Sequence, residues 1–130
     1  MGSARKGERE VYEAVLEAQE AGVAAVRAGV KAGDVDAATR GVLEKAGLAE
    51  WFTHSTGHGV GIEIHEGPRL GKRKPDSKEP TEKLKAGMVI TIEPGVYMPG
   101  KFGVRIEDTV LVTAEGCEIL TPATKAWIEL

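Results

Sequence analysis

The chain has 130 residues, enough for one small domain, and its hydrophobic content of 42% is ordinary for a globular protein. The net charge of −3, with both signs interspersed, excludes a continuous basic face, so we expect no binding to nucleic acid or to an anionic membrane surface. No apolar run approaches the roughly 20 residues that a membrane-spanning helix needs. Residues 1–6 are interpreted as an expression leader or a disordered end, so the domain is expected to cover residues 7–130.

The single cysteine and the scarcity of aromatic residues lead to two further expectations. Cys117 has no partner for an internal disulfide and suits a reducing, cytoplasmic location. We expect it to pack in an edge strand and not to act as a nucleophile. Aromatic residues make up only 5% of the chain, which is low for a domain that closes its own core. We therefore expect another chain to complete the burial.

Two helices are predicted in the first third of the chain. Apolar residues at spacings of three and four predict a first helix with a wide apolar face, which stops at residues 29–33. Small residues on this face, such as Gly22, would let another backbone approach closely. Asp34 is a suitable N-cap for a second helix, with Asp36 in a capping position beside it, and Gly47 is the expected C-terminal cap.

An extended, glycine-rich segment follows the helices. Gly57, Gly59 and Gly61 occupy alternate positions of residues 54–61, a pattern that is poor for a helix and typical of extended chain in close contact with a neighbour. The sequence therefore predicts that this segment packs tightly against another strand.

The flanks of this segment have simpler interpretations. Trp51 and Phe52 could line a pocket, but aromatic residues in this context are more often part of a core or an interface. Residues 71–83 are charged and contain proline, so we expect an exposed loop. Its basic residues, in which we see no phosphate-binding context, are Lys72, Arg73 and Lys74.

From residue 88 onward the pattern is that of β-strands. Turns are predicted at residues 99–100 and at residues 115–116, each of which contains a glycine. Two N-terminal helices followed by an antiparallel sheet define an α+β fold.

Alternation along these strands places carboxylates on one face. Thr91 and Glu93 point away from the helices on one strand, and Glu107 and Thr109 do so on the next. Two glutamates on neighbouring strands could converge on a divalent cation, although a single glutamate is usually just an exposed charge. Asp108 falls among the apolar positions, and the pattern does not explain it.

The histidines favour a functional site. All three in the chain, His54, His58 and His65, lie in one short segment flanked by glycines. A lone histidine is usually structural or solvated, but three beside glycines that allow close approach indicate a site. Imidazole and carboxylate ligands together suit Mn, Co, Fe or Zn.

Three segments then make the pattern specific. They are HSTGHGVGIEIHEGPRL, AGMVITIEPGVYMPG and GVRIEDTVLVT, and they occur in this order. Together they resemble the second half of the catalytic domain of Xaa-Pro aminopeptidases and prolidases, relatives of methionine aminopeptidase and creatinase. The preceding helical region is similar as well, so the resemblance covers residues 7–121. It implies half of a pita-bread fold, in which two N-terminal helices pack on an antiparallel sheet.

The resemblance also implies a role for individual residues in a dinuclear metallopeptidase site. The activity it implies is hydrolysis of an N-terminal peptide bond assisted by two divalent metal ions. The implied metal ligands are His58, Glu93 and Glu107. The implied substrate-contacting and charge-balancing residues are His65, which contacts substrate or stabilises the oxyanion, His54 in the substrate pocket, and Arg105 beside the carboxylates.

The sequence departs from the family in one respect. The family takes two aspartate ligands from strands that precede the helices, and this chain has no such pair there. Four family carboxylates balance the four charges of two divalent ions, whereas Glu93 and Glu107 supply only two. We therefore expect one copy of the chain to bind a single ion weakly or not at all.

Three hypotheses remain open at this point. In the first, a homodimer places both glutamates of one copy beside those of the other across a twofold axis, with weak or no peptidase activity on a peptide substrate. In the second, the chain is a complementation fragment, active only with its missing N-terminal half. In the third, it is a non-catalytic binding or structural module.

Overall fold

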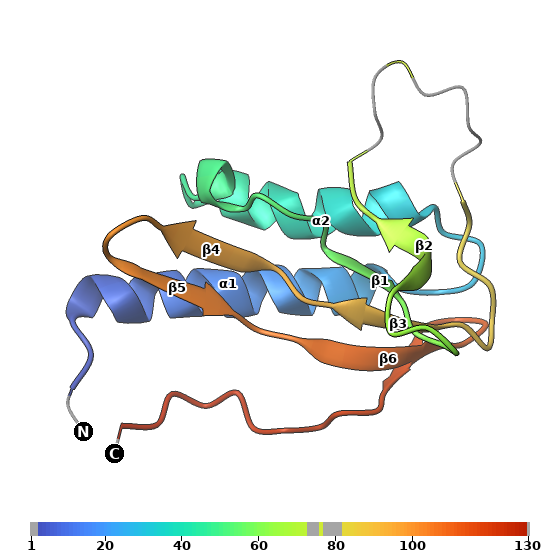
Figure 1. Ribbon diagram of the computed structural model, residues 1–130. Helices are drawn as coiled ribbons and strands as arrows, with labels where there is room; N and C mark the ends of the chain where they lie inside the picture. The colour runs from blue at the N-terminus through green and yellow to red at the C-terminus, as the bar shows by residue number, and fades with distance from the viewer. Residues whose placement is uncertain (1–2, 73–75, 77–81, 130) are drawn as a thin grey trace.

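Two long helices cover one face of an antiparallel sheet in the computed structural model, which describes residues 3–72, 76 and 82–129 (Figure 1). The helices are α1 (Lys6–Ala25) and α2 (Ala32–Lys45), and a short 3-10 helix, η1 (Ala49–Trp51), follows α2. This arrangement confirms the predicted α+β fold.

The strands form one five-stranded sheet and one hairpin. Their bounds are β1 (Gly57–Gly59), β2 (Glu66–Leu70), β3 (Val89–Ile92), β4 (Gly95–Met98), β5 (Phe102–Arg105), β6 (Asp108–Val112) and β7 (Cys117–Ile119). The sheet has the order β2-β1-β3-β6-β7, and β4 pairs with β5. Cys117 therefore lies in an edge strand, as predicted, and burial raises the pKa of its thiol. The strand β2 was not anticipated by the sequence pattern.

Each of the two long strands expected after residue 88 is interrupted once. The first breaks into β3 and β4 at Pro94, which has no N–H to donate to a ladder. The register nevertheless continues across the break, since Ile92 faces Asp108 and Gly95 faces Arg105. Glu93 therefore lies across from Glu107 in the two-stranded ribbon.

The predicted helix ends are partly wrong. Helix α1 stops at Ala25, before the glycines at residues 29–33. Helix α2 begins with Lys31 as its N-cap, so Asp34 lies inside the first turn and caps nothing. The reason is tertiary: the segment before α2 is tied to distant chain, with Ala32 N donating to Glu82 O at 2.9 Å. These long-range bonds set the helix start.

The end of α2 is as predicted. Gly47 has a φ of +71°, the left-handed conformation that glycine adopts at low cost. Its N–H donates to Glu44 O at 3.0 Å, and Leu48 N donates to Leu43 O at 2.8 Å. This is a Schellman motif, so the glycine closes the helix by its backbone alone.

The core fills the space between the helices and the sheet. Helix α1 turns its predicted stripe inward, and Val15 and Ala18 are fully buried. At Gly22 a Cβ atom would lie 2.5 Å from Thr39 Oγ1 and 2.9 Å from Ile92 Cγ2, so the small residue makes room for two side chains and not, as we predicted, for another backbone. Phe52 is buried and Trp51 packs beside it, which confirms a core role for both.

The structure explains the buried Asp108. Gln19 Nε2 donates to its Oδ2 atom at 2.7 Å, while Thr121 Oγ1 and Lys125 Nζ donate to Oδ1 at 3.1 and 2.9 Å. Thr121 and Lys125 belong to a C-terminal segment that runs beside β6 and ends near the N-terminus (Figure 1). Asp108 thus joins helix α1 to this segment, which is a long-range role that no local pattern encodes.

A pair of buried threonines allows a test of the polar interior. Thr39 Oγ1 has no hydrogen-bond partner among the described residues, whereas Thr56 Oγ1 donates to Asp36 Oδ1 at 2.8 Å. Thr39→Val is expected to raise the free energy of unfolding by about 1 kcal/mol, because it removes an unpaired buried hydroxyl. Thr56→Val is expected to lower it by about 1 to 3 kcal/mol. Urea unfolding of both variants checks the opposite signs, and equal effects would contradict the assignment.

Candidate metal centre

The site is organised around His58, the middle residue of β1. Both of its neighbours are glycines for a steric reason: a Cβ at Gly57 would overlap the backbone oxygen of Thr91, and one at Gly59 would overlap the backbone of Gly67. The predicted close packing of this segment is therefore confirmed. It holds His58 between β2 and β3.

The imidazole of His58 contacts the carboxylate of Glu93. The distance from Nε2 to Oε1 is 3.1 Å, and both side chains are largely buried. The other ring nitrogen, Nδ1, lies 2.8 Å from Gly59 O. A carbonyl oxygen only accepts, so Nδ1 carries the proton, and in the neutral ring Nε2 presents a lone pair to Glu93. Two acceptors then face each other, an arrangement that a proton or a bound cation between them makes favourable.

Thr91 holds both of these side chains in place. Its hydroxyl donates to Glu93 Oε1 at 2.9 Å and accepts from the backbone N–H of His58 at 3.1 Å. Thr91 is 3% exposed, so it has little freedom to reorient. Strand alternation placed Thr91 on the correct face, but its link to His58 was not predicted.

The other predicted site residues surround this pair. Arg105 Nε lies 4.0 Å from Glu93 Oε2, on a half-exposed side chain. The rings of His65 and His58 have centroids 4.3 Å apart. Glu107 lies across from Glu93 in the ribbon and is exposed, with no hydrogen bond or ion pair to any described residue.

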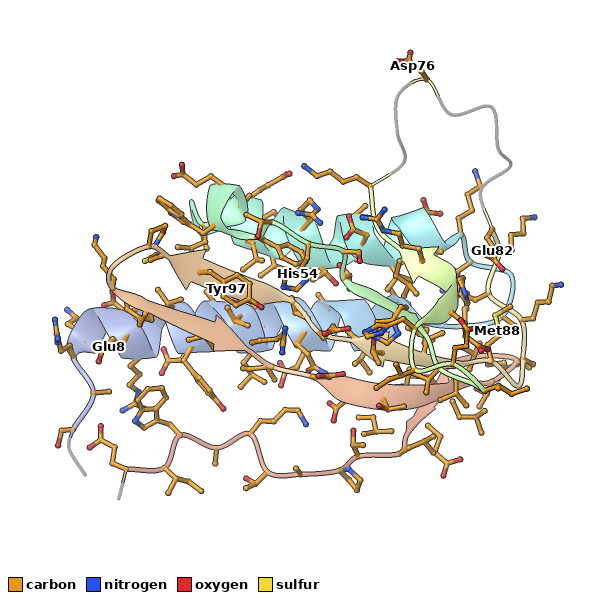
Figure 2. All side chains as sticks on the ribbon, in the orientation of Figure 1. Glu8, His54, Asp76, Glu82, Met88 and Tyr97 are labelled. Carbon is orange, nitrogen blue, oxygen red and sulfur yellow. The ribbon has the colours of Figure 1, made fainter. Side chains whose placement is uncertain are left out.

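His54 lies at the rim of the site and contacts Tyr97, a residue that the sequence reasoning missed. Tyr97 Oη donates to His54 Nε2 at 2.8 Å, and His54 Nδ1 donates to Ser55 O at 2.8 Å (Figure 2). A Cβ at Gly95 or at Gly103 would collide with the Tyr97 ring. These two glycines were the available signal, because they mark the space that an aromatic ring occupies.

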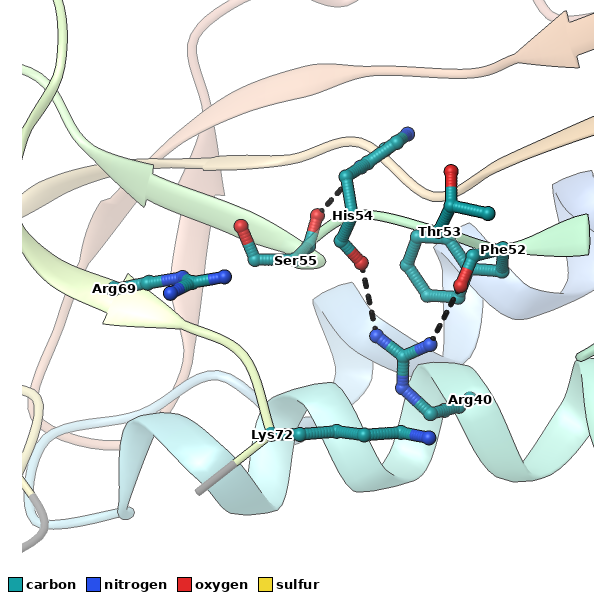
Figure 3. A pocket seen from close by; sticks show the side chains of 7 residues that line it. All are labelled: Arg40, Phe52, Thr53, His54, Ser55, Arg69 and Lys72. Atoms are coloured by element: carbon teal, nitrogen blue, oxygen red, sulfur yellow. Dashed lines mark hydrogen bonds between the residues drawn. The ribbon is translucent and has the colours of Figure 1, made fainter. Parts of the chain in front are cut away.

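A cationic cavity of about 210 Å³ adjoins this rim (Figure 3). Its lining residues are Arg40, Phe52, Thr53, His54, Ser55, Arg69 and Lys72. Three of them are cations, of which Arg40 is paired with Asp36, and none is a carboxylate. Arg69 is paired with His58 across β1 and β2, but none of the candidate ligands His58, Glu93 and Glu107 lines the cavity. The role of Arg69 was not predicted. Lys72 is exposed, as expected for the loop, while Arg73 and Lys74 lie outside the described residues.

The donor set suits a divalent cation but is incomplete. His58 and Glu93 fit two ligands of one ion, with imidazole nitrogen and carboxylate oxygen as donors. Within the described part of the chain, no three His, Cys, Asp or Glu side chains gather closely enough to hold a metal ion. One copy therefore presents part of a site.

The profile of metallopeptidase family M24 matches residues 1–114, and the chain belongs to this family. Two curated relatives are the Xaa-Pro dipeptidases of Pyrococcus furiosus and Pyrococcus horikoshii. The first is 49% identical over 121 residues, which is 93% of this chain and 33% of the relative. The second is 44% identical over 128 residues, or 98% of this chain and 35% of the relative. The chain thus spans about a third of the length of these relatives.

Solved structures agree on the fold. An Xaa-Pro dipeptidase from Bacillus anthracis superposes with a TM-score of 0.92 at 45% identity, covering 100% of this chain and 35% of that one. An X-Pro aminopeptidase from Thermotoga maritima gives a TM-score of 0.88 at 40% identity, covering 97% and 34%. The resemblance to half of the pita-bread domain is confirmed. Among the described helices, none is both long and apolar enough to cross a membrane.

Proposed function

We propose that this chain supplies the metal-binding half of a prolidase-like peptidase site. His58 and Glu93 hold a divalent cation, Mn, Co, Fe or Zn, and Glu107 joins them from across the ribbon. The observation that carries the proposal is the 3.1 Å contact between His58 Nε2 and Glu93 Oε1, with the His58 proton committed to Gly59 O. Membership of a metallopeptidase family supports it.

The surrounding residues have roles that follow from their positions. A bound divalent ion would polarise the carbonyl group of a peptide bond. His65, whose ring is tilted by 53° against that of His58, would contact that substrate. Arg105 offsets the negative charge of Glu93, and His54 lines the adjoining pocket.

We further propose that a second copy of the chain completes the site. A twofold axis would bring four glutamates together, enough to balance two divalent ions, and would add a second His58. Two large apolar side chains beside the site support an interface there: Ile62 and Ile64, in the loop between β1 and β2, are 105% and 74% exposed. A single copy is expected to have weak or no peptidase activity.

The mass of the native species tests this proposal. Light scattering with and without Mn should give a dimer that the metal stabilises. In the Glu93→Ala/Glu107→Ala variant, the metal should have no effect on the mass or on the melting temperature. A folded monomer that does not respond to metal would overturn the proposal and favour a non-catalytic module.

A second candidate is complementation by a separate segment. The relatives continue over about two thirds of their length outside the match, and such a segment could supply the two aspartate ligands. Adding the corresponding part of a relative in trans should then restore metal binding and peptidase activity to a chain that is inert alone. Metal-stabilised dimers of the chain by itself would argue for the second copy instead.

The cationic cavity points to a substrate with a negative charge close to the scissile bond. A dipeptide has its C-terminal carboxylate there, and Arg69, which lines the cavity together with Lys72, is paired with the candidate ligand His58 across β1 and β2. We expect Ala-Pro to bind about 10-fold or more tightly than its C-terminal amide, the range of a charge-assisted hydrogen bond.

Competition binding by calorimetry measures this preference. Arg69→Gln should remove most of it, whereas Arg27→Gln, which makes the same charge change at an exposed position of the helix-connecting segment, should keep it. An unchanged preference in Arg69→Gln would contradict a carboxylate-binding role.

A further inference from the structure

We propose that the buried ion pair of Asp36 and Arg40 is a positioning device for His54. It fixes the backbone on both sides of this histidine and thereby directs the imidazole to the rim of the candidate metal centre. The functional meaning of the device rests on the proposed function, but its geometry does not.

The pair is internal to helix α2 and closed to solvent. Its side chains are 2% and 8% exposed, for Asp36 and Arg40 respectively. Arg40 Nε donates to Asp36 Oδ2 at 2.9 Å, and Nη2 donates to Oδ1 at 3.0 Å, so the contact is bidentate. The prediction that Asp36 caps the helix is therefore wrong. Asp36 is the buried partner of Arg40, one turn later in the same helix.

Arg40 uses its remaining donors on the chain around His54. Nη1 donates to Phe52 O at 3.0 Å and Nη2 to His54 O at 2.9 Å, as Figure 3 shows. The guanidinium also lies 4.1 Å from the centroid of the Phe52 ring. Two carbonyls on either side of Thr53 are thus held by one planar group.

Asp36 holds the other side of the same segment. Its Oδ1 atom accepts from Thr56 N at 3.2 Å and from Thr56 Oγ1 at 2.8 Å. Phe52 O, His54 O and Thr56 are therefore all tied to α2 by one ion pair. With the backbone fixed on the helix side, the His54 side chain extends the other way and meets Tyr97.

This use of donors argues for more than packing. A buried ion pair gives little net stability compared with apolar residues of similar size, because removing both charges from water is costly. Here every bond outside the pair goes to residues 52–56, the segment that carries His54 and leads into β1. Neither Asp36 nor Arg40 forms a hydrogen bond with His58 or Glu93, so we place them as positioning residues that act through His54.

Nitrogen-15 NMR of the histidine rings, in metal-free protein, measures the position of His54 directly. In the parent chain His54 should show two separate signals, one from a protonated Nδ1 and one from a hydrogen-bonded Nε2. The Nε2 signal is assigned with Tyr97→Phe, because loss of the Tyr97 hydroxyl should shift it. Arg40→Lys keeps the charge but loses the planar fork, and we expect its two His54 signals to merge toward an average. The His58 signals should stay in place.

A matched control separates positioning from general loss of stability. Val112→Ala removes buried atoms from β6, in the core cluster that does not contain Phe52, and should leave the His54 signals unchanged at a similarly lowered melting temperature. A folded Arg40→Lys with parental His54 signals would overturn the inference. If Arg40→Lys fails to fold, Thr56→Val keeps the ion pair and removes one tie; it should still shift the His54 signals, and unchanged signals there would overturn the inference too. Because these measurements use metal-free protein, neither result bears on whether the chain binds metal, which the light-scattering experiment tests separately.

Discussion

Gly57→Ala is expected to lower the free energy of unfolding by about 3 kcal/mol, the upper part of the range for an overpacked core. The new Cβ would overlap the backbone oxygen of Thr91, and a backbone atom in a paired strand cannot turn aside as a side chain can. Relief requires β1 to move away from β3. That movement would break the 2.7 Å bond from Glu93 N to Thr56 O and separate His58 from Glu93.

Gly41→Ala is the matched control. Gly41 lies inside α2, and no atom lies within 4 Å of the position its Cβ would take. We expect this change to raise the free energy of unfolding by about 1 kcal/mol, because alanine is the better helix former. Urea unfolding measures both, and a Gly57→Ala variant as stable as the parent would show that the strands are not packed as closely as described.

The second large effect is expected from Asp36→Ala. Its removal leaves the Arg40 guanidinium buried without its carboxylate, which typically costs about 3 to 5 kcal/mol. The backbone N–H and the hydroxyl of Thr56 lose their acceptor at the same time. We therefore expect a lower urea midpoint with little change in the slope of the transition.

The double variant Asp36→Leu/Arg40→Met tests the cause of that loss. It removes the charge together with its partner, so we expect it to be more stable than Asp36→Ala. A loss below 1 kcal/mol in Asp36→Ala would mean that the guanidinium reaches water without its partner, contrary to the burial of the pair.

Local patterns predicted much of the fold. Helical spacing identified the buried face of α1, the glycine after α2 identified its end, and alternate glycines identified the close packing of β1. For the helices the cause lies within a few residues of the signal, whereas the glycines of β1 indicate close contacts whose partners, such as Thr91, lie elsewhere in the chain. The start of α2 was missed because its bonds come from Glu82, fifty residues away in the chain.

In the candidate site, too, some residues were predicted from local patterns and others depend on contacts between distant segments. Alternation placed Glu93 and Glu107 on one face, and the register of the ribbon sets them across from each other. The contacts of Thr91, Tyr97 and Arg69 were not predicted, since each depends on which strands become neighbours. Asp36 and Arg40 could have been paired from their spacing of four, but the burial that gives the pair its role is a tertiary property.

Calorimetric titration of Mn or Zn into the purified chain, in parallel with His58→Ala, tests the central claim most directly. We predict saturable binding to the parent chain and its loss in the variant, because Nε2 of His58 is the one imidazole nitrogen in contact with Glu93 among the described residues. Circular dichroism would verify that the variant is folded. Equal binding by the parent and His58→Ala would place any metal elsewhere and contradict the assignment of this site.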